Sequence, residues 1–243
     1  MINILIPLAG RSQIFEGQFF PKPFFEINDH IMIEYPIAAL NRITEEKRFI
    51  FVLRHEDCVK FHLDKTIELL TSPNTVIIRQ IGDTKGAVCT CLLAIDHINN
   101  DDPLIISNAD QYLDVDYNQV LAHFRKHKAQ GGLVCFDSVH PQWSYAKLDK
   151  EDNIIQTAEK QPLSRHAIAG FYYFEKGKYF VTASERSLEH EAHCNGLYYT
   201  APIYNELLLE GLSLKAYHVP KEKYHSFYSF SKIRDFEKQN VKI

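Results

Sequence analysis

The amino-acid sequence predicts an α/β fold that is Rossmann-like, with a mostly parallel central sheet, helices on both faces and a small antiparallel extension. Short apolar runs alternate with helical patterns up to about residue 137, as βαβ units require. Right-handed crossovers between parallel strands place the helices on both faces of the sheet. After residue 137 the pattern changes to a hairpin and mixed elements, which predicts the antiparallel extension.

The first half is predicted as strands and helices in strict alternation. The strand segments are short and apolar, and the helical segments repeat apolar residues three or four positions apart. In chain order the predicted elements are the strand Ile2–Leu8, the helix Ile31–Arg42, the strand Phe49–Leu53, the helix Asp57–Leu70, the strand Thr75–Gln80, the helix Gly86–Asp96, the strand Pro103–Ser107, the helix Asn118–Lys128 and the strand Gly132–Phe136.

The second half is predicted to begin with an antiparallel hairpin, because the polar turn Asp149–Asn153 joins two strand patterns. The predicted elements are the hairpin strands Ser144–Leu148 and Ile154–Thr157, the strand Ala167–Phe174, the helices Phe180–Glu191 and Tyr198–Leu209, the strand Ser213–Val219 and the helix Lys232–Gln239. No linker rich in Pro, Gly or Ser separates the halves. We therefore expect a single domain over residues 1–243, with a nucleotide-binding core at 1–137 and a substrate-binding extension at 138–243.

Composition and charge exclude several classes of protein. Of the 243 residues 45% are hydrophobic and 24% charged, which excludes disorder and collagen-like repeats. Lys and Arg number 27 and Asp and Glu 31, so the net charge is −4. The chain as a whole therefore lacks the excess of positive charge that is typical of proteins that bind nucleic acid or anionic membranes. Five scattered cysteines, mostly in apolar runs, are typical of buried thiols in a reducing compartment.

The chain opens on the apolar run Ile2–Leu8 without the basic flank or cleavage site of a signal peptide. No apolar run approaches membrane-spanning length. We expect a cytoplasmic protein with no nucleic-acid or membrane partner, and a homo-oligomer remains open.

Two segments near the first strand are suited to an anionic ligand. Ala9 and Gly10 follow that strand, where open α/β sheets bind ligands and small residues let backbone N–H groups approach phosphate. Lys22 lies between Pro21 and Pro23, which stiffen the chain that carries this cation. The alternatives are an ordinary turn after the strand and a solvated lysine.

Three further segments contain candidate residues for binding a ligand or a metal ion. Thr84 can cap the helix that begins at Gly86, and this glycine leaves room for a planar base; a plain capped helix is the alternative. Asp110 ends the fourth strand, and Mg²⁺ favours one or two carboxylates together with phosphate oxygens; the alternative is a turn-capping acid. Adjacent Glu159 and Lys160 point to opposite faces of a strand, and a solvated pair is the alternative.

The order of these segments resembles the sugar-nucleotide pyrophosphorylase (nucleotidyltransferase) family. The matching series is PLAG, FPKPFFEI with IMIEYPI, TKGAVCTCLLA, SNADQ, and EK with AIAGFYYF, and it spans roughly residues 2–240. The resemblance implies a Rossmann-like core that, with Mg²⁺, joins a nucleoside triphosphate to a sugar 1-phosphate. The products are a nucleotide-sugar and pyrophosphate.

The resemblance also implies roles for individual residues. Lys22, Asp110 and Arg11 would be catalytic. The nucleotide would contact Leu8, Ala9, Gly10, Arg11, Lys22, Gln80, Thr84 and Gly86, with Gly86 beneath the base. The second substrate would contact Asn108, Glu159, Lys160 and Gly170: Glu159 would take sugar hydroxyls, Lys160 the sugar phosphate, and Gly170 would let the sugar approach the backbone. Asp110 and His225 would hold metal.

The sequence departs from the family pattern at three places. The usual Gly-x-Gly-(Ser/Thr)-Arg loop has Ser12 in place of its second glycine and Ile14 in place of its arginine, so Arg11 is the nearby guanidinium that could substitute. Leu197 stands where many members carry a sugar-binding acid. His225 lies where a second metal aspartate is often found, and aromatic packing is its alternative role.

The favoured reaction is in-line attack of a phosphate oxygen on the α-phosphorus of a triphosphate. It needs positioning and charge neutralisation and no general base. The resemblance and the small residues Gly86 and Ala87 favour a pyrimidine base, and the resemblance implies a role in surface-glycan (capsule) synthesis.

Three alternatives remain open. One is a cytidylyltransferase that acts on a phosphorylated alcohol or amino compound. Another is a glycosyltransferase, although Asn108 stands where that class needs a second acid. The third is a non-catalytic nucleotide-binding relative.

Overall fold

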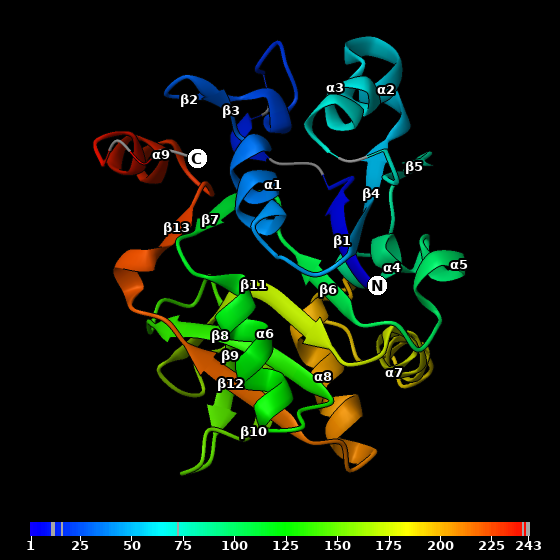
Figure 1. Cartoon of the computed structure of the whole chain (residues 1–243), viewed down its shortest axis with the longest axis vertical. Coiled ribbons are helices and arrows are strands. Elements are labelled where there is room, and N and C mark those ends of the chain that lie inside the picture. Colours follow the sequence, from blue (N-terminus) through cyan, green and yellow to red (C-terminus); the bar gives the residue numbers. More distant parts are fainter. Residues whose placement is uncertain (11–12, 16, 72, 240, 242–243) are drawn as a thin grey trace.

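The computed structural model describes residues 1–10, 13–15, 17–71, 73–239 and 241, and a nine-stranded mixed sheet forms its centre (Figure 1). The strands of this sheet are β1 (Ile2–Leu8), β4 (Lys47–Arg54), β5 (Val76–Gln80), β6 (Leu104–Ser107), β8 (Gly131–Asp137), β9 (Ser144–Leu148), β10 (Ile154–Glu159), β11 (His166–Phe174) and β12 (Leu214–His218). The helices are α1 (Glu34–Asn41), α2 (His55–Phe61), α3 (Leu63–Leu70), α4 (Ala87–Leu92), α5 (Ile95–Ile98), α6 (Tyr117–Lys126), α7 (Gly177–Glu189), α8 (Thr200–Leu209) and α9 (Phe230–Glu237).

Within the central sheet, β1, β4, β5 and β6 pair with one another only in parallel, as the sequence predicted. β1 pairs in parallel with β4 on one side and β6 on the other, β4 pairs in parallel with β5, and β12 with β8. β11 is antiparallel and lies between β6 and β8, a position that the sequence did not predict. The predicted hairpin is present as β9 and β10, and it joins the sheet through the first part of β11.

Alternating side chains of the central strands build a separate apolar layer on each face of the sheet. Ile4 and Ile6 pack on one face and Leu5 on the other, and Phe51 and Val52 of β4 divide in the same way, because successive side chains of a strand point to opposite faces. Residues of α1, α2, α3, α6 and α9 cover the first layer, and residues of α4, α5, α7 and α8 cover the second. The expected α/β fold with helices on both faces is therefore confirmed.

Several predicted helices differ from the observed ones, and for three of them the reason lies in the neighbouring backbone. The pattern over Asp57–Leu70 forms two helices, α2 and α3, because His62 between them has φ +56° and ends the first. The pattern over Gly86–Asp96 is likewise divided into α4 and α5. Helix α1 begins three residues after the predicted start at Ile31, since β3 (His30–Ile31) pairs with β2 (Glu26–Ile27) in a small hairpin.

A second small sheet brings the C-terminal part of the chain to the end of β6. β7 (Gln111–Leu113) pairs antiparallel with β13 (Tyr224–Ser226), and the Phe227 N–H donates to the Asp110 carbonyl at 2.8 Å. Figure 1 shows this pair of strands beside α1 and α9. Three-residue strands carry too little periodicity to be predicted, so the sequence analysis missed both.

Gly86 lies where two segments of backbone cross. Its φ is +104°, and a Cβ at this position would lie 2.5 Å from the Tyr198 carbonyl oxygen. The Tyr198 N–H donates to Lys85 O and the Val88 N–H donates to Tyr198 O, so the segment before α8 is fixed against the start of α4. A side chain at Gly86 would force these two hydrogen-bonded backbone segments apart.

No helix within the described part of the chain has the length and apolar character needed to cross a membrane.

We expect Gly86→Ala to lower the free energy of unfolding by more than about 2 kcal/mol, because the strain of a positive φ is added to a backbone clash. Gly211→Ala is the matched control: its φ is +74°, but no described atom lies within 4 Å of the added Cβ. The control should cost about 1–2 kcal/mol, the strain of the left-handed backbone alone. Urea unfolding measures both, and equal losses would contradict the packing argument.

Candidate active site

A cleft of about 1130 Å³ opens at the carboxyl ends of three adjacent parallel strands. Its lining includes Leu8 at the end of β1, Arg54 at the end of β4, and Asn108 to Asp110 directly after β6. Ligands of open α/β sheets bind at this edge of the sheet, because the connections there leave a crevice. The segment that carries Lys22 forms part of another wall of the same cleft.

Lys22 and Asp110 meet inside this cleft. The Lys22 Nζ lies 2.5 Å from Asp110 Oδ2, and the side chains are 21% and 33% exposed. Lys22 Nζ also lies 5.5 Å from the centroid of the Phe15 ring. The sequence analysis expected the proline-stiffened cation and the acid at the strand end to converge, and the structure places them in direct contact.

Backbone hydrogen bonds hold the Lys22 segment in place. Pro21 is extended, with φ −65° and ψ 157°, and the Phe25 N–H donates to the Lys22 carbonyl at 3.0 Å. The Ile33 N–H donates to the Pro23 carbonyl, which ties the segment to the start of α1. Lys22 is thus a long cation on a fixed base, and little chain entropy is lost when an anion binds it.

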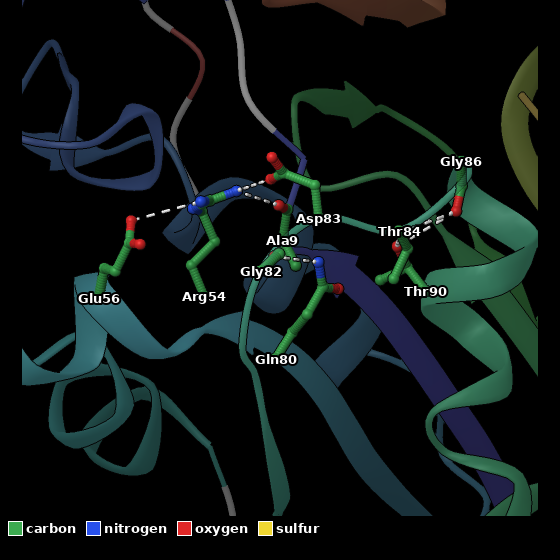
Figure 2. A network of polar contacts seen from close by, with 9 residues as sticks. All are labelled: Ala9, Arg54, Glu56, Gln80, Gly82, Asp83, Thr84, Gly86 and Thr90. Atoms are coloured by element: carbon green, nitrogen blue, oxygen red, sulfur yellow. Dashed lines mark hydrogen bonds and ion pairs between the residues drawn. The ribbon is translucent and has the colours of Figure 1, made fainter.

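Arg54 is a cleft residue that the sequence analysis missed. Its guanidinium donates to the Ala9 carbonyl at 3.1 Å and to Asp83 Oδ1 at 2.9 Å through Nη1, and to Glu56 Oε2 at 3.3 Å through Nη2 (Figure 2). Burial lowers the pKa of Arg54, but its hydrogen bonds to Asp83 and Glu56 more than offset this and raise the pKa. The rule that identified Asp110, a charged residue where a parallel strand ends, also applies to Arg54.

The residues expected around the nucleotide phosphates lie partly on the cleft. Leu8 and Gly10 line it, whereas Ala9 is buried and turns its carbonyl toward Arg54. Gln80 is buried, and its Nε2 donates to the Gly82 carbonyl at 3.0 Å. Gln80 Oε1 has no hydrogen-bond partner among the described residues. Arg11 lies outside the described residues.

The residues expected near the base have structural contacts instead. Gly86 faces the backbone of Tyr198. This contact explains why the position holds a glycine, and no bound base is needed for the explanation. Thr84 does not cap α4: its hydroxyl lies 2.6 Å from the Thr90 hydroxyl and 3.3 Å from the Gly86 carbonyl (Figure 2). Neither Thr84 nor Gly86 belongs to the described lining of the cleft.

Glu159 and Lys160 have different surroundings. Glu159, the last residue of β10, is half-buried and accepts a hydrogen bond from the Ser144 hydroxyl, and burial raises the pKa of its carboxyl group. Lys160 follows with φ +54°, lines the cleft, and donates to the Tyr199 hydroxyl at 3.1 Å. This hydrogen bond raises the pKa of Lys160. Of the two, only Lys160 belongs to the described lining of the cleft.

Gly170 makes room for side chains at the end of β6. Its φ is +59°, and an added Cβ would lie 2.4 Å from both Asn108 Nδ2 and Gln111 Oε1. The Gly170 carbonyl accepts from the Asn108 N–H at 2.9 Å and from Gln111 Nε2 at 3.1 Å. Asn108 lines the cleft, so Gly170 supports the cleft wall from behind; the sequence analysis expected it to face a sugar.

His225 is packed among aromatic rings. Its ring centroid lies 6.0 Å from that of Tyr112, in a stacked arrangement, and 4.9 Å from that of Phe236. Burial lowers the pKa of His225. The described residues contain no group of three His, Cys, Asp or Glu side chains that could hold a metal ion. Aromatic packing, the alternative weighed for His225, is what the structure shows.

Exposed phenylalanines form the mouth of the cleft, and the sequence analysis missed them as well. Phe19 is 75% and Phe20 55% exposed, and both rings contact Phe61 of α2. Lys60 Nζ lies 4.9 Å from the centroid of the Phe61 ring. The cleft therefore combines an apolar mouth with a charged interior.

The sequence and the fold were compared with those of known proteins. A model of the nucleotidyl transferase family matches residues 18–200, about three quarters of the chain. No curated protein matches the sequence.

Solved structures share the fold over nearly the whole chain. A nucleoside-diphosphate-sugar pyrophosphorylase from Vibrio cholerae RC9 superposes with a TM-score of 0.83 at 22% identity, over 97% of this chain and 100% of that one. A putative glucose-1-phosphate thymidylyltransferase from Bacillus anthracis gives 0.79 at 16% identity, over 100% and 97%. A UDP-glucose pyrophosphorylase from Acinetobacter baumanii gives 0.76 at 15% identity, over 98% and 93%.

The raised pKa of Glu159 predicts a pH dependence of stability. The folded protein binds this proton more tightly than the unfolded chain, so Glu159 destabilises the fold as pH rises through the usual range of a glutamate. We expect the stability of the wild type relative to Glu159→Gln to fall as the pH rises from about 4 toward neutral. Urea unfolding across this range measures the difference.

Glu151→Gln, at an exposed position in the turn of the same hairpin, is the control and should show no such trend. A difference between wild type and Glu159→Gln that stays constant with pH would contradict the effect of burial.

Proposed function

The chain belongs to the nucleotidyl transferase family, and we propose that it joins a nucleoside triphosphate to a sugar 1-phosphate, giving a nucleotide-sugar and pyrophosphate. The observation that carries the proposal is the Lys22–Asp110 pair inside a large cleft at the carboxyl ends of parallel strands. A cation and a carboxylate in contact there suit a ligand that brings both phosphate charge and a divalent cation.

The reaction is an in-line displacement at phosphorus. An oxygen of the sugar phosphate attacks the α-phosphorus of the triphosphate, a new P–O bond forms, and the bond to the β-phosphate oxygen breaks to release pyrophosphate. The attacking monoester is already ionised at neutral pH, so no general base is needed, and the protein positions the reactants and neutralises charge. In this scheme Lys22 contacts the α-phosphate and the incoming phosphate, and Lys160 lies on the cleft for the sugar phosphate.

Asp110 would hold Mg²⁺ in this proposal. Its carboxylate lies in the cleft and is one-third exposed, and Mg²⁺ at phosphate sites is bound by one or two carboxylates with the remaining positions filled by phosphate oxygens and water. A single carboxylate therefore fits the ion. When bound, the ion would supply positive charge to the triphosphate. His225 takes no part, because its ring is packed between aromatic side chains.

We propose a pyrimidine base and a place in surface-glycan (capsule) synthesis. The base is supported by the fold shared with proteins described as a thymidylyltransferase and a UDP-glucose pyrophosphorylase. Asn108 and Gly10, which both line the cleft, would contact the substrates.

A phosphorylated alcohol or amino compound is the second candidate acceptor. Leu197 lines the cleft and is 39% exposed, and Phe19 and Phe20 add apolar surface at its mouth. These residues favour an acceptor with fewer hydroxyl groups than a sugar.

Pyrophosphate release tests the proposed reaction. Each common nucleoside triphosphate would be combined with Mg²⁺ and either sugar 1-phosphates or phosphorylated alcohols and amino alcohols. Turnover with a sugar 1-phosphate supports the first proposal, and turnover with the other acceptors alone supports the second. Binding of nucleotide without turnover under any combination would overturn both in favour of a non-catalytic relative.

We expect Lys22→Ala to lower kcat by at least about 10²-fold, the scale of one lost charge-stabilising contact in the transition state. Lys223→Ala is the matched control. Lys223 forms an ion pair with Asp114, which follows β7 as Asp110 precedes it, and Lys223 lies outside the described cleft lining. Pyrophosphate release at saturating substrate measures both variants. Near-normal turnover of Lys22→Ala would contradict the role.

We expect Asp110→Asn to abolish the Mg²⁺-dependent activity and to leave the fold intact, since this side chain lies in the cleft and not in the core. A Mg²⁺ titration of the rate and a thermal unfolding curve measure the two effects. Asp114→Asn, which breaks the Lys223 pair, should keep the normal Mg²⁺ dependence. The same dependence in Asp110→Asn would show that the ion is held elsewhere.

A further inference from the structure

Arg54, the last residue of β4, ties together the loops that follow β1 and β5 and the first turn of α2. Its contacts are the Ala9 carbonyl after β1, Glu56 after β4 and Asp83 after β5 (Figure 2). The Arg54 side chain is 10% exposed, whereas those of Glu56 and Asp83 are 71% and 63% exposed. One nearly buried guanidinium therefore links two loops and a helix at this edge of the sheet.

The contact with Ala9 sets the direction of a peptide group at the cleft. The described chain has no cis peptide bonds, and in a trans peptide the C=O and the following N–H point in opposite directions. Because the Ala9 carbonyl points at Arg54, the Gly10 N–H points away from it. Gly10 is exposed on the cleft lining, and no described atom lies within 4 Å of the place where its Cβ would be. An anion thus has space to approach this backbone.

We propose that Arg54 is a positioning residue that holds the Ala9–Gly10 peptide in the orientation in which its N–H binds a phosphate of the nucleotide. This inference rests on the proposed function and extends it to a residue that acts through the backbone. A backbone N–H stabilises the charge of a phosphate best when the protein already holds the N–H in the binding direction, because the peptide group then need not reorient when the phosphate binds. Lys cannot replace Arg here with the same geometry, because one end of the planar guanidinium reaches two loops and the other end reaches α2.

Arg48 at the other end of β4 provides a matched comparison. Its Nη2 also donates to a backbone carbonyl, that of His97, at 3.0 Å, and its guanidinium donates to the Asn3 side chain. Arg48 lies outside the described lining of the cleft. Loss of either arginine removes a hydrogen bond from the same strand to a backbone carbonyl, so a purely structural role of that contact predicts the same effect on pyrophosphate binding for both.

The experiment compares Arg54→Gln with Arg48→Gln in the full chain. The affinity for inorganic pyrophosphate with Mg²⁺ is measured by calorimetry, and the Gly10 amide resonance is followed by ¹⁵N NMR. We expect Arg54→Gln to weaken pyrophosphate binding by about tenfold or more, the scale of a lost hydrogen bond to a charged group, and to shift the Gly10 resonance. Arg48→Gln should lower the melting temperature and leave both quantities unchanged.

Two results would overturn the proposal. One is an equal loss of affinity in the two variants, and the other is an unchanged affinity in Arg54→Gln. If Arg54→Gln does not fold, Asp83→Ala removes one partner of the guanidinium at an exposed position and should change both quantities in the same direction by less.

The same measurements separate this inference from the proposed function. Arg54-dependent pyrophosphate binding in a protein that turns over no triphosphate would refute the reaction and leave the positioning role standing. A wild-type protein that binds no pyrophosphate would refute both.

Discussion

The parallel pairing of β1 with both β4 and β6 is the constraint on which the rest of the site depends. Parallel strands end at the same edge of a sheet, so residues far apart in the chain become neighbours there. Arg54 and the Leu8–Gly10 turn meet in this way, and Asp110 follows β6 beside them. The apolar layers on the two faces hold this edge in register, because a shift of one residue would exchange the side chains of β1 between the two layers.

Local pattern was sufficient to predict most of the fold and the centre of the site. Runs such as Phe49–Leu53 are apolar on both faces, as buried parallel strands must be, and the structure has strands at all of the predicted places. Lys22 and Asp110 could be identified because each has a local signal: flanking prolines for one and the end of a strand for the other. Their contact follows from the topology that the same pattern predicts.

The remaining features depend on contacts between distant segments, which a single sequence does not display. Gly86 and Gly170 were expected to face ligands, but their neighbours are Tyr198, Asn108 and Gln111, brought there by tertiary packing. The position of β11 between β6 and β8 is likewise set by long-range pairing. His225 has the chemistry of a metal ligand, and only the surrounding rings reveal it as a packing residue.

The pairing of β7 with β13 affects how the protein is made. The backbone of Asp110 is hydrogen-bonded to Phe227, so the wall of the cleft that carries this acid is complete only with a segment that is synthesised well after Asp110 itself. A nascent chain emerging from the ribosome has β1, β4 and β6 available long before that segment. Synthesis therefore supplies β1, β4 and β6 early and the final support of Asp110 late, and a product interrupted between them would lack the support.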